Sequence, residues 1–280
     1  MDENGGSSAS FLERAYVFTK RKAPTYLGFI IRLGAYVSLI IDTIVCTIHR
    51  PPRFSLIVKQ LYEVGVTSLL VVSITGFSTG LVLAAQSFYQ LADKGLASVT
   101  GLLVAKSMMT ELGPVLTAFM VTGRVGASMC AELGTMQVTE QIDALKTMAV
   151  NPNRYLIAPR LIAGTFMMPL LTIYSILMGI WGGYLIAVYY FGMSPTAYFD
   201  PMPHSITIFE FVTGIIKAFI FGVFIMTIAC YKGITTTGGA EGVGRSTTSC
   251  VVISYCCILL CNFFLTVALN HIHEEFPWLL

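Results

Sequence analysis

The side chains with the clearest chemical potential in this sequence are ionisable groups inside apolar segments. Glu111 lies in MMTELGPVL, directly before Gly113-Pro114. A charged group at the bilayer centre costs about 2.5–3.5 kcal/mol on insertion scales, so it normally faces protein or a water-filled cavity. Pro114 removes one backbone hydrogen bond and bends the helix beside this carboxylate. Glu111 is therefore predicted either to line a substrate cavity or to bond a neighbouring helix.

Two lysines share this apolar setting. Lys106 lies five residues before Glu111, a separation that places it on a different helix face, so it is not expected to pair with that carboxylate. Lys217 lies near the outer end of another apolar stretch. A long side chain there reaches the interface, and Lys217 is expected to snorkel rather than to contact a lipid phosphate.

Residue sets that support catalysis or metal binding are missing. No Ser-His-Asp set, HExxH motif or pair of carboxylates stands out. Residues 239–246 fit GxxxxG[K/R][ST], but a phosphate-binding loop needs Lys and a βαβ domain, whereas here Arg245 stands in that place and an apolar segment follows. The seven cysteines lack CxxC spacing and are expected to pack as small hydrophobes. We predict a non-catalytic chain without cofactor or metal.

The composition is that of a helical membrane protein. Hydrophobic residues make up 55% of the chain and charged residues 11%, and the mean hydropathy is +0.75. A bilayer core needs about 20 apolar residues per helix. Stretches of this order without charge cover residues 64–92, 161–199 and 246–270, and interrupted ones cover residues 99–121 and 211–231. An all-α, polytopic fold with five transmembrane helices is predicted.

The basic residues predict the orientation. With five spans and a cytoplasmic N-terminus, all but Lys94, Lys106 and Lys217 of the 17 Lys and Arg residues lie on the cytoplasmic side. This asymmetry is the positive-inside rule. The C-terminus is then predicted on the outer side.

The N-terminal part is predicted to precede the membrane domain of residues 54–280. Residues 1–23 read as a mobile tail, and residues 24–53 as an interfacial or re-entrant amphipathic segment, either one helix or a helix pair. This segment carries Arg32 and Asp42 and has basic clusters on both sides. A sixth span would put one cluster on the wrong face, so the interfacial location is preferred.

A charged island between residues 123 and 160 is predicted to dock onto a protein. Asn151-Pro152-Asn153 stops its helix. On one helix, Glu140 and Asp143 would share a face, while Leu145 and Met148 would share another. We predict a short amphipathic helix, parallel to the membrane, that seats in a protein groove.

Small residues recur every four positions in two spans. One stripe comprises Gly76, Gly80 and Ala84, and the device returns at Gly179, Gly183 and Ala187. Such stripes let helix backbones approach closely, and they fit either packing within the chain or a homodimer seam.

Several long motifs resemble the MlaE/YrbE family of ABC-transporter permeases, which serve bacterial phospholipid transport and have plastid relatives. In order, they are QLYEVGVTSL, TELGPV, GRVGASMCAELGTMQVTEQIDAL, MAVNPNRYLIAPR, GIWGG and GVGRSTT, and the resemblance covers roughly residues 55–270. It implies a homodimer in the bacterial inner membrane, with an N-terminal interfacial helix and five spans in each copy. It also implies a cytoplasmic ABC ATPase, a STAS-domain accessory protein, a periplasmic MCE-domain lipid-binding protein and a phospholipid substrate, but no nucleic acid.

The resemblance further implies two functional regions. The stretch 132–148 matches the coupling helix that seats in the ATPase, and the charged or polar residues in and near it are Glu132, Glu140, Gln141, Asp143, Lys146 and Arg154. The positions that match the lipid cavity are Gln86, Phe88, Glu111, Pro114 and Lys217. Members often carry a basic residue just before the cavity Glu, where this chain has Thr110.

The favoured function is a lipid-translocating permease that moves phospholipid between the inner and outer membranes, driven by a partner ATPase. One alternative is an ion- or proton-coupled transporter with Glu111 and Lys106 as a relay, but inverted repeats and matched broken helices are not visible. The other is a membrane anchor that only holds an MCE-type protein and an ATPase together.

Overall fold

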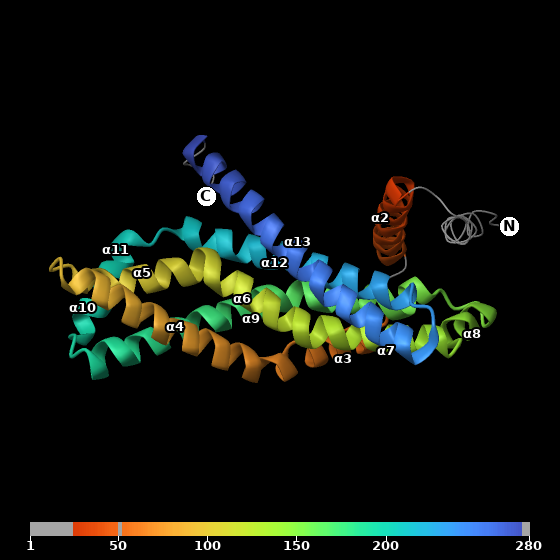
Figure 1. Ribbon diagram of the computed structural model, residues 1–280, viewed down its shortest axis with the longest axis horizontal. Coiled ribbons are helices and arrows are strands. Elements are labelled where there is room, and N and C mark those ends of the chain that lie inside the picture. Colours follow the sequence, from red (N-terminus) through yellow and green to blue (C-terminus); the bar gives the residue numbers. More distant parts are fainter. Residues whose placement is uncertain (1–24, 50–51, 276–280) are drawn as a thin grey trace.

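The computed structural model describes residues 25–49 and 52–275, and within these ranges the chain is helical, without strands. Five segments have the length and hydropathy of a membrane span, and they run along the long axis of the molecule (Figure 1). These spans are Phe54–Ala92, Ala97–Val138, Asn153–Tyr190, Ile208–Ile234 and Gly239–Glu275. The predicted all-α, multi-pass membrane fold is confirmed.

Three of the spans consist of several helical pieces. The first span contains α3 (Phe54–Val64), η2 (Val66–Ser68) and α4 (Leu69–Ala92). The second contains η3 (Ala97–Val99), α5 (Thr100–Ser107), η4 (Met108–Leu112), α6 (Gly113–Val121), η5 (Thr122–Gly126) and α7 (Ala127–Val138). The third contains η6 (Asn153–Ile157), α9 (Ala158–Leu185) and η7 (Ile186–Tyr190). Segments η4 to η7 are π-helical, with wider turns than the α-helix.

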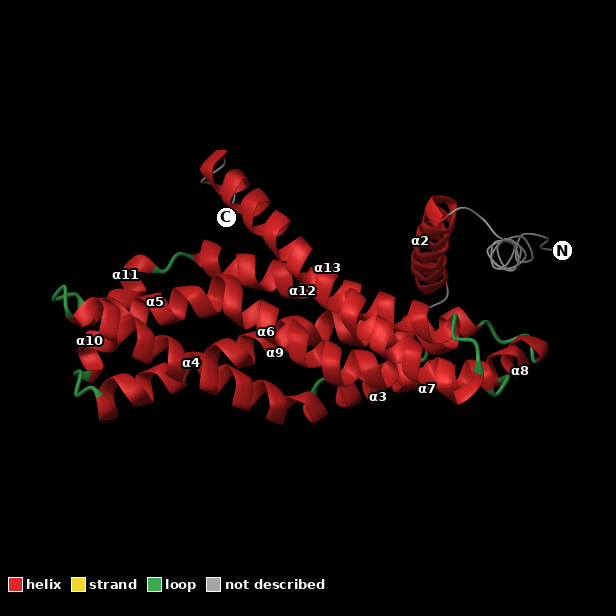
Figure 2. Ribbon diagram, viewed as in Figure 1, coloured by secondary structure: helices red, strands yellow, loops and turns green. Residues whose placement is uncertain are grey.

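The fourth and fifth spans are single helices, α12 (Ile208–Ile234) and α13 (Gly239–Glu275). Short helices occupy the two ends of the bundle (Figure 2). Helix α8 (Gln141–Thr147) lies at one end, and α10 (Pro195–Phe199) and α11 (Pro201–Ser205) lie at the other. The turn before α13 contains Gly238 and Gly239, both with positive φ, a conformation that glycine adopts without strain.

Helix α2 (Thr25–His49) is one continuous helix, so the alternative of a helix pair is wrong. It runs across the direction of the bundle near the α8 end (Figure 1). Tyr36 anchors it, because its hydroxyl lies 2.6 Å from the Thr227 hydroxyl of α12. Among the described residues, its apolar part includes Leu33–Thr47. The opposite face exposes Leu33, Val37, Ile41, Ile44 and Val45. An interfacial location for α2 stays a prediction.

The two stripes of small residues pack against each other inside the chain. Gly76, Gly80 and Ala84 are all buried on α4. A Cβ atom at Gly80 would collide with the backbone carbonyl of Gly179 on α9. Contact at this distance requires glycine, because two backbones meet with no side chain between them. Packing within the chain is therefore confirmed, and a homodimer seam along this stripe is wrong because α9 already covers it.

Helix α13 is attached to the bundle much more weakly. Its buried residues are Cys250, Ser254, Ile258 and Leu269, a narrow stripe along one side. Its C-terminal half leads away from the other helices in Figure 1. The remaining surface is apolar and exposed, so lipid or a further protein surface has to cover it.

The cysteines are free thiols, as their spacing indicates. All seven lack a disulfide. Cys130, Cys230 and Cys250 are fully buried among apolar side chains of α7, α12 and α13. The predicted role in packing is confirmed for these three.

We predict that Gly80→Ala destabilises the protein by about 1–3 kcal/mol, the usual cost of overpacking a well-packed contact. The matched control is Gly244→Ala, since a Cβ at Gly244 would have no neighbour within 4 Å. Thermal unfolding of the detergent-purified protein measures both. Equal melting temperatures for the two variants would contradict the close α4–α9 contact.

Candidate functional site

A buried ion pair joins the second and fourth spans. Lys217 Nζ lies 2.7 Å from Oε1 of Glu111, and the Lys217 side chain is fully buried. The ammonium also donates to the backbone oxygen of Thr110 at 2.9 Å and to the Thr266 hydroxyl at 2.8 Å. An ammonium has three donors, and here each has an acceptor.

Pro114 explains why the Thr110 carbonyl is available. In an α-helix the N–H of residue 114 would bond to the carbonyl of residue 110, but proline has no N–H. The π-helical segment η4 directly precedes this proline. The freed carbonyl oxygen then accepts a hydrogen bond from Lys217. The carbonyl that Pro114 leaves free is thus one of the three acceptors of the buried Lys217 ammonium.

The fifth span completes the site on the other side of the carboxylate. Asn262 Nδ2 donates to Oε2 of Glu111 at 2.8 Å, and the Thr266 hydroxyl lies 2.9 Å from Oε1. The Glu111 side chain nevertheless stays 35% exposed. The Oδ1 atom of Asn262 is buried and has no hydrogen-bond partner among the described residues. The site therefore holds a partly open carboxylate beside an unsatisfied acceptor.

The expected snorkelling of Lys217 is wrong. Seven residues separate Lys217 from Glu210 at the start of α12, which places it about 10 Å inside the helix. A complete set of three acceptors, one of them charged, holds the ammonium there and removes the reason to reach the interface.

Lys106 belongs to a separate ion pair, as its helix face suggests. Its Nζ lies 3.0 Å from Oε1 of Glu210. Glu210 also accepts from the backbone N–H of Thr207 and closes the capping box at the start of α12. Lys106 and Glu111 are not partners, so the two carboxylates have distinct cations.

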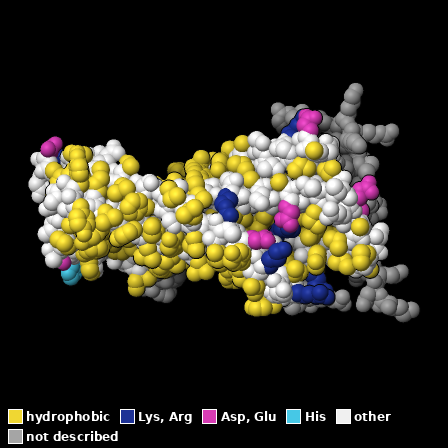
Figure 3. All heavy atoms as spheres, turned by 90° about the horizontal axis from the view of Figure 1, so that it is seen from below, with side chains coloured by type: hydrophobic (Ala, Val, Ile, Leu, Met, Phe, Trp, Pro, Cys, Tyr) yellow, Lys and Arg dark blue, Asp and Glu magenta, His cyan; other side chains and the backbone are white. Residues whose placement is uncertain are grey.

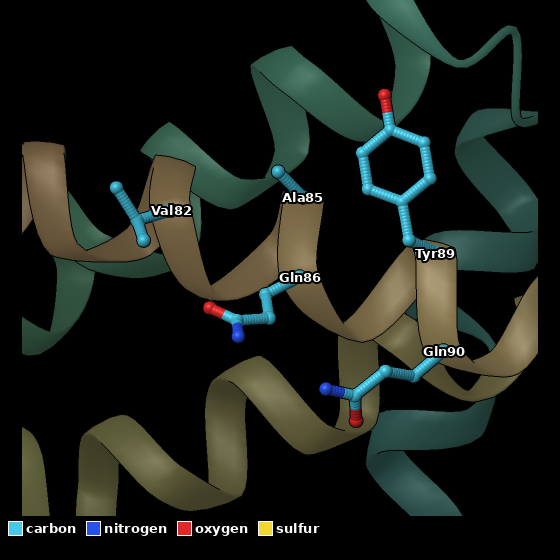
Figure 4. Close-up of a pocket in the computed structure, with 5 residues that line it drawn as sticks. All are labelled: Val82, Ala85, Gln86, Tyr89 and Gln90. Atoms are coloured by element: carbon cyan, nitrogen blue, oxygen red, sulfur yellow. The ribbon is translucent and has the colours of Figure 1, made fainter.

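The other cavity candidates lie apart from this ion pair. Gln86 lines a shallow, open concavity with Val82, Ala85, Tyr89 and Gln90, all on α4. Figure 4 shows Gln86 and Gln90 pointing to the same side of the helix and Tyr89 pointing elsewhere.

Phe88 and Pro114 have structural neighbours instead. The ring of Phe88 stacks on Phe191 with centroids 4.1 Å apart. Pro114 is buried and lies against the Gly214 position of α12. A single chain therefore brings Glu111 and Lys217 together but does not enclose them with Gln86 and Phe88.

The charged island is not one helix over residues 132–148, as the resemblance implies. Helix α7 ends at Val138, and α8 begins at Gln141. Between them the Thr139 hydroxyl bonds to the carbonyl of Thr135, and Glu140 adopts a left-handed conformation with φ of 59°. Side-chain bonds of this kind compete with the helix. Glu140 precedes α8, so the expectation that it shares a helix face with Asp143 is wrong.

Glu132 has a different environment from the tip of the island. It lies on α7 and pairs with the buried Arg160 of α9 at 2.8 Å. At the tip, Asp143 and Lys146 form an exposed ion pair at 2.8 Å. The side chain of Ile142, also on α8, is buried against the bundle. Arg154 lies on η6, where the chain returns to the bundle. In Figure 3 the charged side chains on the visible face gather toward the α8 end.

Comparison of the sequence with known proteins identifies the family of this chain. The profile of the family described as Permease MlaE matches residues 57–268. The chain belongs to the MlaE permease family. It is 44% identical over 223 residues to a probable ABC transporter permease protein of Rickettsia felis, covering 79% of this chain and 86% of the relative.

This MlaE-family permease is also similar to proteins of another bacterium and of a plant. It is 40% identical over 215 residues to the intermembrane phospholipid transport system permease protein MlaE of Haemophilus influenzae, with 76% and 82% of the two chains covered. It is also 38% identical over 208 residues to the chloroplastic protein TRIGALACTOSYLDIACYLGLYCEROL 1 of Arabidopsis thaliana, with 74% and 59% covered.

Sequence reasoning missed two residues at the Glu111–Lys217 pair and one at the separate Lys106 pair. Asn262 and Thr266 lie in an apolar segment without charges, four residues apart and thus on one helix face. The amide of Asn262 in the middle of such a segment was the available signal, because unsatisfied polar groups are costly there. Glu210 was detectable as the last residue of the capping-box pattern Thr207-x-x-Glu210.

Lys217 is fully buried and Glu111 is partly exposed, so variants at the two positions should differ in stability. Glu111→Leu leaves the fully buried ammonium of Lys217 without its anion, and we expect a loss of about 3–5 kcal/mol. Lys217→Met should cost less, because Glu111 is partly exposed and keeps its bonds to Asn262 and Thr266. The double variant should be more stable than Glu111→Leu alone.

Thermal unfolding of the purified variants checks this order. Lys146→Met is the control, since its partner Asp143 is exposed and such pairs contribute about 0–1 kcal/mol. If Glu111→Leu proves milder than Lys217→Met, the ammonium does not depend on this carboxylate.

Proposed function

We propose that this chain is the membrane subunit of an ATP-driven phospholipid transporter and that Glu111 contacts the lipid headgroup. Its relative in Haemophilus influenzae is named as an intermembrane phospholipid transport permease. The observation that carries the proposal is the partly open carboxylate of Glu111, deep in apolar sequence and held by a fully buried cation. A carboxylate that stays accessible in an apolar segment can bond to a ligand as well as to its cation.

The headgroup competes with the fifth span for the carboxylate. Asn262 and Thr266 hold α13 against Glu111 through hydrogen bonds alone. A headgroup with hydroxyl or ammonium donors would replace these bonds and also satisfy the free Oδ1 of Asn262. Entry of a lipid would then displace Asn262 and Thr266 from Glu111 and shift α13.

A second copy of the chain would close the cavity. One chain leaves Glu111 partly open, and α13 exposes Leu260, Phe263, Phe264 and Val267 to the outside. A homodimer would cover this apolar surface and place the concavity around Gln86 inside the assembly.

ATP hydrolysis belongs to a partner chain that docks on α8. This helix projects from the end of the bundle as a short hairpin tip, flanked by the left-handed residues Glu140 and Ala149. Its underside carries the buried Ile142, so a push on its exposed face passes to the packed ends of the spans. In this assembly the α8 end is cytoplasmic, and the α10–α11 end faces a periplasmic MCE-domain protein. A STAS-domain protein accompanies the ATPase.

The alternatives have less support. A relay between Glu111 and Lys106 would need contact between them, but each has another partner. A pure anchor would need neither an open carboxylate nor an unsatisfied acceptor at mid-span.

Transport by the reconstituted complex tests the headgroup contact. Glu111→Gln removes the charge with little change of shape, and we expect at least about a tenfold loss of lipid movement, since a charged hydrogen bond contributes about 1.5–3 kcal/mol. Glu210→Gln is the matched control, a carboxylate that pairs with Lys106 outside the cavity. Equal transport by Glu111→Gln and the wild type, with the complex intact, refutes the contact.

Charge reversal at the hairpin tip tests the docking of the ATPase. Glu140→Lys with Asp143→Lys should lower co-purification of the ATPase more than about tenfold, because like charges across an interface cost several kcal/mol. Asp93→Lys with Asp200→Lys makes the same change at the opposite end and should leave co-purification of the ATPase unchanged. Retention of the ATPase by the tip variant means that it docks elsewhere.

A further inference from the structure

The second span has one continuous, partly exposed face below Glu111, and Tyr255 of α13 packs on it at Phe119. From residue 111 on, exposed or partly exposed pairs alternate with buried pairs at a strict four-residue period, at 111–112, 115–116, 119–120, 123–124 and 127–128. In an ideal α-helix a four-residue repeat rotates by about 40° each time. The wider π-turns of η4 and η5 counteract this rotation and keep the face in line.

This face is apolar between two polar positions. Its middle consists of Val115, Leu116, Phe119 and Met120. Glu111 marks one end and Arg124 the other. Thirteen residues at 1.5 Å each separate them by about 20 Å, or about two thirds of a 30 Å hydrocarbon core. Arg124 therefore lies nearer than Glu111 to the α8 end of the bundle.

Arg124 is held by hydroxyl groups rather than by a carboxylate. Its Nη1 donates to Thr67 Oγ1 at 2.8 Å and to Ser68 Oγ at 3.0 Å. Both hydroxyls donate their own protons to backbone carbonyls of α3, so their lone pairs are directed to the arginine. These residues form η2, where the first span changes from α3 to α4.

Arg124 has no counter-ion among the described residues, in contrast to three other cations of the spans. Lys106, Arg160 and Lys217 each pair with a carboxylate. Among the described residues, no carboxylate lies within ion-pair distance of Arg124. Its guanidinium is exposed beside Gly123, which has no side chain to cover it. The remaining N–H groups are thus oriented by two fixed hydroxyls and free to bind an anion.

We propose that Arg124, held by Thr67 and Ser68, binds the phosphate of a phospholipid in the leaflet nearer α8. A guanidinium matches phosphate oxygens with two parallel hydrogen bonds. The apolar face above it would carry the acyl chains toward Glu111. This proposal rests on the proposed transport function and adds a second headgroup position to it, about 20 Å from the first along the same helix.

Photo-crosslinking with the full complex in lipid nanodiscs tests the site. The probe is a phospholipid with a diazirine in its headgroup, and mass spectrometry maps the adducts to residues 67–68 and 123–128. Arg124→Gln should lower these adducts at least about tenfold, equivalent to about 1.4 kcal/mol. Arg124→Lys should give an intermediate yield, since it keeps the charge but loses the two-pronged geometry.

The control variant is Lys59→Gln, which removes an exposed cation on neighbouring α3 and should leave the adducts unchanged. Thr67→Val with Ser68→Ala keeps the charge of Arg124 but frees its side chain. This variant should also lower the yield, and it carries the test if Arg124→Gln does not fold.

Four results would overturn the proposal. One is an unchanged yield in Arg124→Gln, and another is equal labelling by a diacylglycerol probe without phosphate. Displacement of the probe by millimolar inorganic phosphate would indicate a site for a free anion. Loss of the dimer in Arg124→Gln, with monomers that still label normally, would indicate a carboxylate of a second copy. If the wild type labels at Arg124 but moves no lipid with ATP, only the transport function fails.

Discussion

A fully buried ammonium in an apolar layer has to keep its anion, and this requirement organises the centre of the molecule. Lys217 cannot leave the fourth span for water, so Glu111 of the second span must stay beside it, and Thr266 of the fifth span supplies a further acceptor. The π-turn η4 and the missing N–H of Pro114 serve the same requirement, because they present the Thr110 carbonyl to the cation. The second and fourth spans are thereby fixed relative to each other at a single depth.

The rest of the packing divides the bundle into a rigid part and a loose part. Helices α4 and α9 meet backbone to backbone through Gly80 and Gly179, a contact with no adjustable side chain. Helix α13 touches the bundle through a narrow stripe that becomes polar at Asn262 and Thr266. Close-packed interfaces have few alternative arrangements, whereas a stripe of hydrogen bonds can exchange partners. Motion of the spans should therefore concentrate at α13.

The sequence predicts the spans and the importance of Glu111, but not the partners of that residue. Uncharged stretches of about 20 residues and a carboxylate within one of them are visible without a fold, because the bilayer sets their cost. That Lys217 pairs with Glu111 depends on how two distant spans pack, and a residue near a helix end looks equally suited to the interface. The break at Glu140 is equally hidden, since a left-handed Glu between two helices follows from tertiary context rather than from propensity.

The same carboxylate that stabilises the bundle is thus also its most exchangeable contact. Oε1 of Glu111 bonds to Lys217 and to Thr266, whereas Oε2 bonds to the amide of Asn262 on α13, the least buried of the five spans. A ligand that supplies a donor to the second oxygen leaves the first bond intact, so the bundle keeps its buried charge neutral while α13 is released. A ligand without such a donor cannot replace the hydrogen bond from Asn262 to the carboxylate. Differential stabilisation of two helix arrangements, which any driven transporter needs, can therefore come from hydrogen bonds to one side chain.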